Sequence, residues 1–319
     1  MSAVRLQICG HKEIMITDIH QEILKSYREF KEKRVLRINA TQLKTWSTCK
    51  EMHRIEYLLG KSAVEPSIHY HFGSVIHKMA EGYWSGKPYM ESFHEALKVA
   101  QELDVRLLNA KDQGKWSSLQ DAIAPITTIY YGYHGESTNL DPPWLNESTI
   151  EWEWGEHAGI KVICNGIVDR LSRDYKLIDT KTASTVGSSW KSDLKKRLLR
   201  EPQMGFYLRY LTESNREPLG IEYEIIVKPY RGSDPRIETI DVTDEVMSFQ
   251  PVFIQQMDWA IREICEFYSK CADAEPWPMS NTACVSMWGE CNFLPVCSGK
   301  TGLDNPKLYK IKEAREVEV

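Results

Sequence analysis

The sequence lacks any uninterrupted run of about 18 apolar residues, which excludes a helical membrane span. Its first twenty residues are interrupted by charges and have no apolar core of a signal peptide, so we expect a cytoplasmic protein. No G-x-x-x-x-G-K-[ST] motif is present, which excludes a P-loop motor within these 319 residues. Internal repeats and low-complexity tracts are absent too, which excludes a solenoid.

A broad excess of basic charge is also missing, since the formal net charge is −5. Nucleic-acid-binding proteins often carry such an excess. An enzyme that holds phosphates through metal ions, however, needs carboxylates at its active centre. It needs basic side chains only along the path of the bound nucleic acid, here called the track. One stretch is rich enough in basic residues to form such a track, with an aromatic side chain at its start: Trp190, Lys191, Lys195, Lys196, Arg197 and Arg200.

Periodicity divides the chain into an accessory segment (1–35), one domain (36–300) and a charged tail (301–319). Within the domain, residues 61–145 are mostly helical, 147–242 carry the sheet, and 276–300 form an irregular cysteine-bearing segment. Strands are expected from Thr149 onward, and the last long helix is expected over 252–270. The fold class is therefore α/β (α+β), with a central mixed sheet flanked by helices and a helical insertion.

The segment from Gly166 to Thr182 predicts a β-hairpin whose turn centres on Asp174. This register places Asp169 opposite Asp179, and like charges at that separation are destabilising unless a cation lies between them. Hard divalent ions such as Mg²⁺ or Mn²⁺ prefer oxygen ligands. Lys181 lies on the same strand face as Asp179 and could stabilise negative charge that develops on a phosphate.

Other features of the hairpin and its neighbours have simpler interpretations. A D-x-K tripeptide is common, and an exposed hairpin with a lysine that neutralises two aspartates would look the same. Taken alone, His77 could be an ordinary surface or core histidine, and Gln203 with Tyr207 an ordinary helix face. The basic run after the hairpin could likewise be a solvated helix face.

Four short motifs occur in a fixed order along the chain. They are G-x-x-x-H ending at His77, G-x-x-D-R ending at Arg170, D-x-K ending at Lys181, and Q-x-x-x-Y ending at Tyr207. In this order they resemble the RecB-like branch of the PD-(D/E)XK nuclease superfamily, over about residues 39–300. The chain departs from that branch at Val168, where proline is usual, and at Asp179, where many relatives have glutamate.

The resemblance implies a restriction-endonuclease-like core and assigns roles to single residues. It makes His77, Asp169, Asp179 and the Thr180 carbonyl ligands of Mg²⁺ or Mn²⁺, and Lys181 the catalytic lysine. Gln203 and Tyr207 would orient the lysine or the nucleic acid, and the basic run from Trp190 would follow the DNA. Glu81, one helical turn beyond His77, is a candidate outer-shell carboxylate, or else an exposed helix charge.

Four cysteines form a second pattern, which is typical of metal ligation in a reducing compartment. Their spacing resembles the iron–sulfur members of the RecB-like group, the Add-type helicase–nucleases and the CRISPR spacer-acquisition nucleases. The resemblance implies a structural [4Fe–4S] cluster; a Zn²⁺ site or unligated thiols are the alternatives. The four cysteines are Cys49, Cys284, Cys291 and Cys297. The six-residue gap between the second and the third is longer than in many relatives.

Taken together, the motifs predict a metal-dependent DNA exonuclease acting in recombination, repair or DNA-end processing. Because no motor motif is present, a helicase or recombination partner would be a separate protein. A stand-alone nuclease of this size is typical of phages, and a phage enzyme would act in the host cytoplasm. Two alternatives use the same fold. One is an inactive DNA-binding scaffold, and the other is an endonuclease, either sequence- or structure-specific or directed by RNA.

Overall fold

The computed structural model describes residues 5–6, 14–15, 30–64, 67–135, 143–183, 202–229, 234–271, 277–286 and 289–311. The chain divides into two compact units. The first comprises Met1–Val64, Trp152–Asn165 and Asp258–Val319, and the second comprises Glu65–Glu151 and Gly166–Met257. Strands β5 (Leu145–His157) and β6 (Ile160–Leu171) and helix α11 (Thr243–Cys271) run from one unit into the other.

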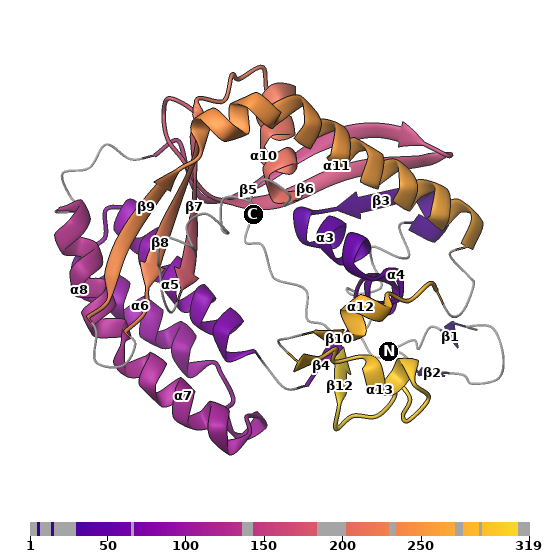
Figure 1. The fold of residues 1–319 in the computed structure, drawn as a ribbon, viewed down its shortest axis with the longest axis horizontal. Coiled ribbons are helices and arrows are strands. Elements are labelled where there is room, and N and C mark those ends of the chain that lie inside the picture. The colour runs from indigo at the N-terminus through magenta and orange to yellow at the C-terminus, as the bar shows by residue number, and fades with distance from the viewer. Residues whose placement is uncertain are drawn as a thin grey trace. The chain divides into compact units, whose positions relative to one another are not determined.

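The second unit carries most of the sheet. Strand β7 (Lys176–Ala183) pairs antiparallel with the end of β6 and parallel with β8 (Gly220–Val227), and β9 (Arg236–Asp241) pairs antiparallel with β8. Strands β7, β8 and β9 lie side by side in Figure 1. The sheet is therefore mixed, and helices flank it, so the predicted fold class is confirmed.

The β6–β7 hairpin has the predicted register, because Arg170 pairs with Ile178 and Leu171 with Leu177. The next pair in this register would join Asp169 to Asp179. Among the described residues, however, regular pairing of these two strands stops one position before it. The two strands therefore part where their aspartates face each other.

Helices of the second unit pack on one face of the sheet around an apolar core. They are α5 (Ile68–Trp84), α6 (Tyr89–Gln101), α7 (Ala110–Asp121) and α8 (Ile123–His134), with a short 3₁₀ turn, η2 (Val105–Leu107). Helix α5 contributes Phe72, Val75, Ile76 and Met79 to this core, and β8 contributes Ile226. Burying the apolar stripe of α5 fixes where its polar face points.

Helix α10 (Pro202–Glu213) begins at a proline, which fits the first turn of a helix. It packs near β8, where the Tyr223 hydroxyl donates to the Met204 sulfur across 3.0 Å. Its Gly205 lies so close to α11 that an added Cβ would be 2.5 Å from the Phe253 carbonyl oxygen. A larger residue at 205 would therefore displace α10 and the side chains that it carries.

The first unit contains short elements. They are β1 (Arg5–Leu6), β2 (Ile14–Met15), β3 (Val35–Ile38), α3 (Ala40–Thr48), α4 (Lys50–His53), η1 (Arg54–Leu58), β4 (Lys61–Ala63), α12 (Asn281–Cys284), β10 (Val285–Ser286), β11 (Gly289–Glu290), α13 (Leu294–Cys297) and β12 (Tyr309–Ile311). Strand β3 pairs parallel with the start of β6, and β4 pairs antiparallel with β12. Asn39 caps α3 through a reciprocal capping box with Gln42.

Two element boundaries differ from the sequence prediction. Strand β5 begins at Leu145, four residues before the expected start at Thr149. Helix α11 begins at Thr243 and passes through Pro251, whereas the sequence placed its start after that proline. Asp244 and Glu245 in its first turn complement the helix dipole, and they favour the earlier start. Whether residues 36–300 form a single domain stays a prediction.

Candidate metal and catalytic centre

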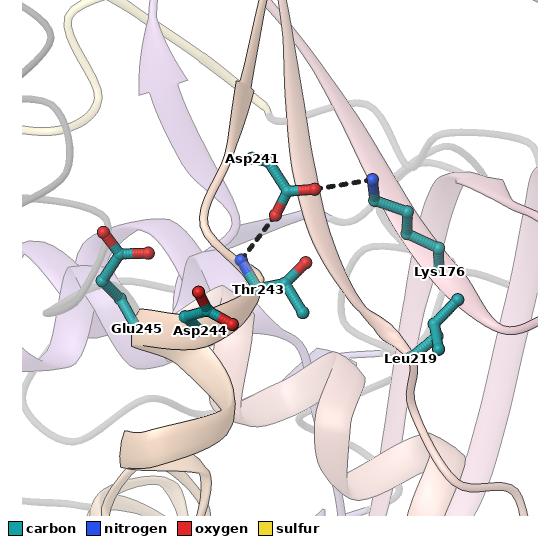
Figure 2. A pocket seen from close by; sticks show the side chains of 6 residues that line it. All are labelled: Lys176, Leu219, Asp241, Thr243, Asp244 and Glu245. Atoms are coloured by element: carbon teal, nitrogen blue, oxygen red, sulfur yellow. Dashed lines mark hydrogen bonds and ion pairs between the residues drawn. The ribbon is translucent and has the colours of Figure 1, made fainter.

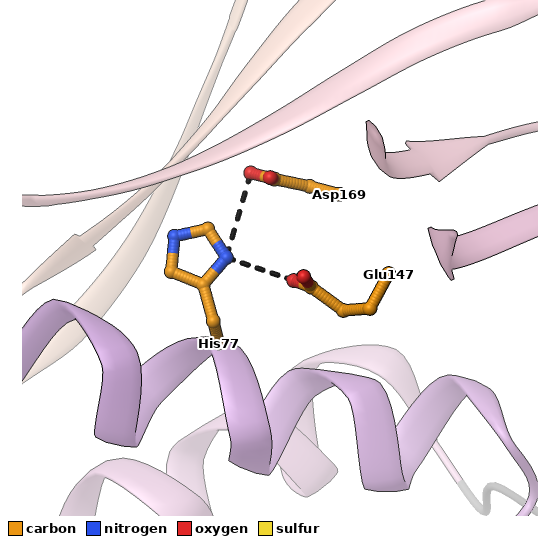
Figure 3. Close-up of side chains that lie close together, drawn as sticks. All are labelled: His77, Glu147 and Asp169. Atoms are coloured by element: carbon orange, nitrogen blue, oxygen red, sulfur yellow. Dashed lines mark hydrogen bonds and ion pairs between the residues drawn. The ribbon is translucent and has the colours of Figure 1, made fainter. Parts of the chain in front are cut away.

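The centre of the candidate site is His77, on the polar face of α5. Its Nδ1 atom lies 2.8 Å from Glu147 Oε1 and 3.6 Å from Asp169 Oδ2 (Figure 3). Among the residues that the structure describes, this is the one group that brings three ligand atoms within 4.8 Å of one another. Burial lowers the pKa of His77, but Asp169 and Glu147 outweigh it and raise the pKa to about 9. The surroundings of His77 therefore favour positive charge.

Sequence reasoning missed Glu147. It lies near the start of β5, two residues before the expected start of the strands at Thr149. Its φ of 43° is in the left-handed region, which is unfavourable for a residue with a side chain. Asn146, the preceding residue, donates to the backbone carbonyl of Glu81 across 2.9 Å and so fixes the start of β5 against α5. No local motif marks Glu147, and the positive φ is visible only in the structure.

Asp179 is 3% exposed and lies beside Lys181 on β7. The Lys181 ammonium is 2.9 Å from Asp179 Oδ1 and 2.7 Å from Oδ2, and the Oδ2 atom accepts no hydrogen bond of regular geometry among the described residues. Burial and the neighbouring Asp169 raise the pKa of Asp179 to about 6, although Lys181 opposes them. A buried carboxylate that faces another carboxylate suits a metal ion as a further source of positive charge.

The Q-x-x-x-Y residues on α10 contact both strands of the hairpin. The Gln203 side-chain amide donates to Asp179 Oδ1 across 3.0 Å and to the Tyr207 hydroxyl across 2.8 Å. The Tyr207 hydroxyl in turn donates to the backbone carbonyl of Ile167 across 2.8 Å. These bonds connect α10 to Asp179 on β7 and to the backbone of β6 two residues before Asp169.

Thr180 connects the aspartates to a buried ionic group. Its backbone N–H donates to Asp169 Oδ2 across 2.9 Å, and its hydroxyl donates to Glu224 across 3.2 Å. Glu224 is 1% exposed and also accepts from Arg170 and from the Tyr130 hydroxyl. Desolvation raises the pKa of Glu224, but Arg170 and His134 outweigh it and lower the pKa to about 2. Glu224 is therefore a buried anion beside the hairpin.

The remaining candidates are placed differently. The Glu81 carboxylate accepts from Lys78 across 2.8 Å on the same helix, and no contact joins it to His77 in the described part of the chain. The basic run lies outside the described residues: Trp190, Lys191, Lys195, Lys196, Arg197 and Arg200.

The four cysteines of the predicted cluster all belong to the first unit. Cys49 lies at the break between α3 and α4, and Cys291 and Cys297 pack against Ile55, Phe293 and Tyr309. Burial raises the pKa of Cys291, and the nearby Cys284 and Cys49 raise it further, so these thiols are neighbours.

Among the described residues, no three of these four thiols lie within 4.8 Å of one another.

A family model of the PD-(D/E)XK nuclease superfamily matches residues 37–298 of this chain. The match covers most of the sequence, so the chain belongs to the PD-(D/E)XK nuclease superfamily. Membership implies a metal-dependent nuclease that hydrolyses phosphodiester bonds, with DNA as the substrate. No curated protein matches the chain.

The donor set fits the divalent ion that this superfamily usually uses. It combines the imidazole of His77 with the carboxylates of Glu147 and Asp169, and the buried Asp179 carboxylate lies on the neighbouring strand. Oxygen-rich sites with an imidazole suit Mg²⁺ or Mn²⁺. Separately, no helix in the described part of the chain is long and apolar enough to span a bilayer.

Proposed function

We propose that this protein is a Mg²⁺- or Mn²⁺-dependent DNA exonuclease of the RecB-like branch, active in recombination, repair or DNA-end processing. The observation that carries this proposal is the convergence of His77, Glu147 and Asp169 beside the Asp179–Lys181 pair. The order of the four motifs supports the branch. The family match supports the nuclease class.

Each residue of the centre has a role in this proposal. His77, Asp169, Asp179 and the Thr180 carbonyl hold the ion, and Glu147 orients His77 through the 2.8 Å hydrogen bond to Nδ1. An acceptor at Nδ1 fixes the tautomer that leaves Nε2 free to ligate. The ion, when bound, supplies an activated water and polarises the phosphoryl oxygen.

Lys181 acts as the electrostatic partner of the scissile phosphate. Its ammonium, 2.7 Å from Asp179 Oδ2, lies close to the carboxylate that would share the ion. A fixed cation at this position stabilises the negative charge that develops on the phosphoryl oxygens during hydrolysis. Gln203 keeps the Asp179 carboxylate in place through its 3.0 Å hydrogen bond.

The cysteines support a second part of the proposal, a structural [4Fe–4S] cluster in the first unit. Cys49 lies at the α3–α4 break, Cys284 ends α12, Cys291 lies between α12 and α13, and Cys297 ends α13. Four thiolates are the usual ligands of such a cluster. The cluster would tie residues near position 49 to the C-terminal segment, and hydrolysis requires no electron from it.

The experiment that tests the proposed activity compares linear and circular DNA. End-labelled single-stranded, duplex and closed circular DNA are incubated with purified protein and either Mg²⁺, Mn²⁺ or a chelator. An exonuclease degrades the linear substrates only, and only with metal. Cutting of circles would show an endonuclease instead, and binding without cutting by any metal-loaded protein would favour the scaffold alternative.

A further inference from the structure

Lys228 is a lysine in an unusual position. It directly follows β8, and its backbone N–H donates to the Ala183 carbonyl at the end of β7 across 2.8 Å. The residue is only 6% exposed. Lysine is almost never buried to this degree unless its charge is paired.

No carboxylate in the described part of the chain pairs with the Lys228 ammonium. The ammonium lies over the Phe72 ring of α5, 5.5 Å from the ring centroid. Burial lowers the pKa of Lys228. An apolar residue of similar length would avoid this desolvation cost, so packing alone does not account for a lysine here.

In the described part of the chain, the neighbours of Lys228 supply no negative charge to pair with it. His69, in the first turn of α5, has a lowered pKa because of burial, then because of Lys228 and Lys115. Among the described residues, Asp112 raises the pKa of His69, and its carboxylate is engaged by Lys115 across 2.7 Å. The ends of β8 and α5 thus form a corner in which no carboxylate of the described residues neutralises Lys228.

This corner lies on the same two elements as the metal centre. Strand β7 carries Asp179 and Lys181 and ends beside Lys228. At the usual rise per residue, the end of the strand is about 13 Å from Asp179. Helix α5 carries both His69 and His77, which are eight residues and about 12 Å apart along the helix axis. A nucleic-acid strand cut at the metal centre would have its neighbouring phosphates within this range.

We propose that Lys228 binds a backbone phosphate of the DNA strand a short distance from the scissile bond, with His69 beside it. This inference rests on the proposed function, because it takes DNA as the ligand. The ammonium supplies a point charge, which binds phosphate without reading the bases. The contact therefore adds affinity and holds the strand, and it adds no sequence preference.

The test measures binding separately from cleavage. A fluorescent single-stranded oligonucleotide is titrated with metal-free full-length protein at several KCl concentrations, and anisotropy gives Kd. Lys228→Met should weaken binding about tenfold and reduce the slope of log Kd against log salt by about 0.7, the value for one phosphate contact on a single strand. Lys228→Arg should keep the slope. The melting temperatures of the two variants show whether each is folded.

The matched control is Lys161→Met, which removes one positive charge from an exposed, ion-paired lysine of β6. It should leave both Kd and slope unchanged. An unchanged slope and Kd in folded Lys228→Met would overturn the inference, and Lys228→Gln repeats the test if the methionine variant does not fold. Cleavage by the wild type with Mn²⁺ is measured in parallel, so that failure of the nuclease activity is distinguished from failure of this contact.

Discussion

Glu147 and His77 are joined by a 2.8 Å hydrogen bond although they are 70 positions apart in the chain. The bond places an acceptor on Nδ1 of a histidine whose other ring nitrogen is available to a metal. Partners of this kind typically contribute 10- to 100-fold to metal affinity. In the proposed centre, Glu147 therefore has a role beside that of the motif residues.

The first prediction concerns this bond. Glu147→Gln keeps the shape of the side chain but removes its charge, so Mn²⁺ affinity measured by calorimetry should fall by about tenfold or more. The control is Glu153→Gln, on the same strand, where the carboxylate is 61% exposed and pairs with Lys161. Equal Mn²⁺ affinity in wild type and Glu147→Gln would remove Glu147 from the centre.

A second prediction concerns the stability of the second unit. Glu224→Gln leaves Arg170 buried without its anion, and breaking a buried pair in this way typically costs about 3–5 kcal/mol. Chemical denaturation should show this loss in the free energy of unfolding. Glu222→Gln, two residues earlier on β8, alters a partly exposed pair with Lys176 and should cost less than about 1 kcal/mol. Similar losses of unfolding free energy in both variants would contradict the claim that burial makes the Arg170–Glu224 pair the more costly one to break.

A third prediction follows from Asp241, which lies between Lys176 and the first turn of α11 (Figure 2). Burial raises the pKa of Asp241, but hydrogen bonds from Lys176 and Thr243 outweigh it and lower the pKa from 3.8 to about 2. A lowered pKa stabilises the fold above pH 3.8, and this contribution disappears as the pH falls towards 2.

Asp241→Asn should therefore be less stable than the wild type at pH 7 and equally stable near pH 2. Because the side chain is 54% exposed, the loss at pH 7 should be below about 1 kcal/mol. Unfolding curves at a series of pH values measure it. The ion-pair explanation would be contradicted if the stability difference between the wild type and Asp241→Asn persisted or grew as the pH fell.

The fourth prediction concerns the cysteines. Protein prepared without oxygen should contain about four irons per chain and absorb in the visible blue. Cys291→Ala should lose both iron and colour, whereas Cys265→Ala, at a buried thiol of α11, should keep them. A colourless wild type without iron, prepared in the same way, would rule out the cluster.

The sequence predicted the hairpin well because its determinants are local. The turn at Asp174 sets the register, and the register alone places Asp169 opposite Asp179. The cap at Asn39 is likewise determined by Gln42, three residues away. Such features depend on neighbours in the chain, which a single sequence displays directly.

Other features depend on contacts between distant segments, and the sequence did not reveal them. The early start of β5 depends on the hydrogen bond between Asn146 and Glu81, 65 positions away. The passage of α11 through Pro251 opposes local preference, since proline in a helix interior typically costs about 3 kcal/mol. Tertiary packing has to outweigh that cost, and it has no local signature.

The central claim is that the Asp179 carboxylate belongs to a metal-dependent hydrolytic centre. The most direct test is the single-turnover rate of cleavage of end-labelled DNA with saturating Mn²⁺, for the wild type and for Asp179→Asn. We expect a folded variant that cuts at least about 100-fold more slowly, the typical effect of losing one preorganised electrostatic group. A folded Asp179→Asn that cuts DNA as fast as the wild type would contradict the account.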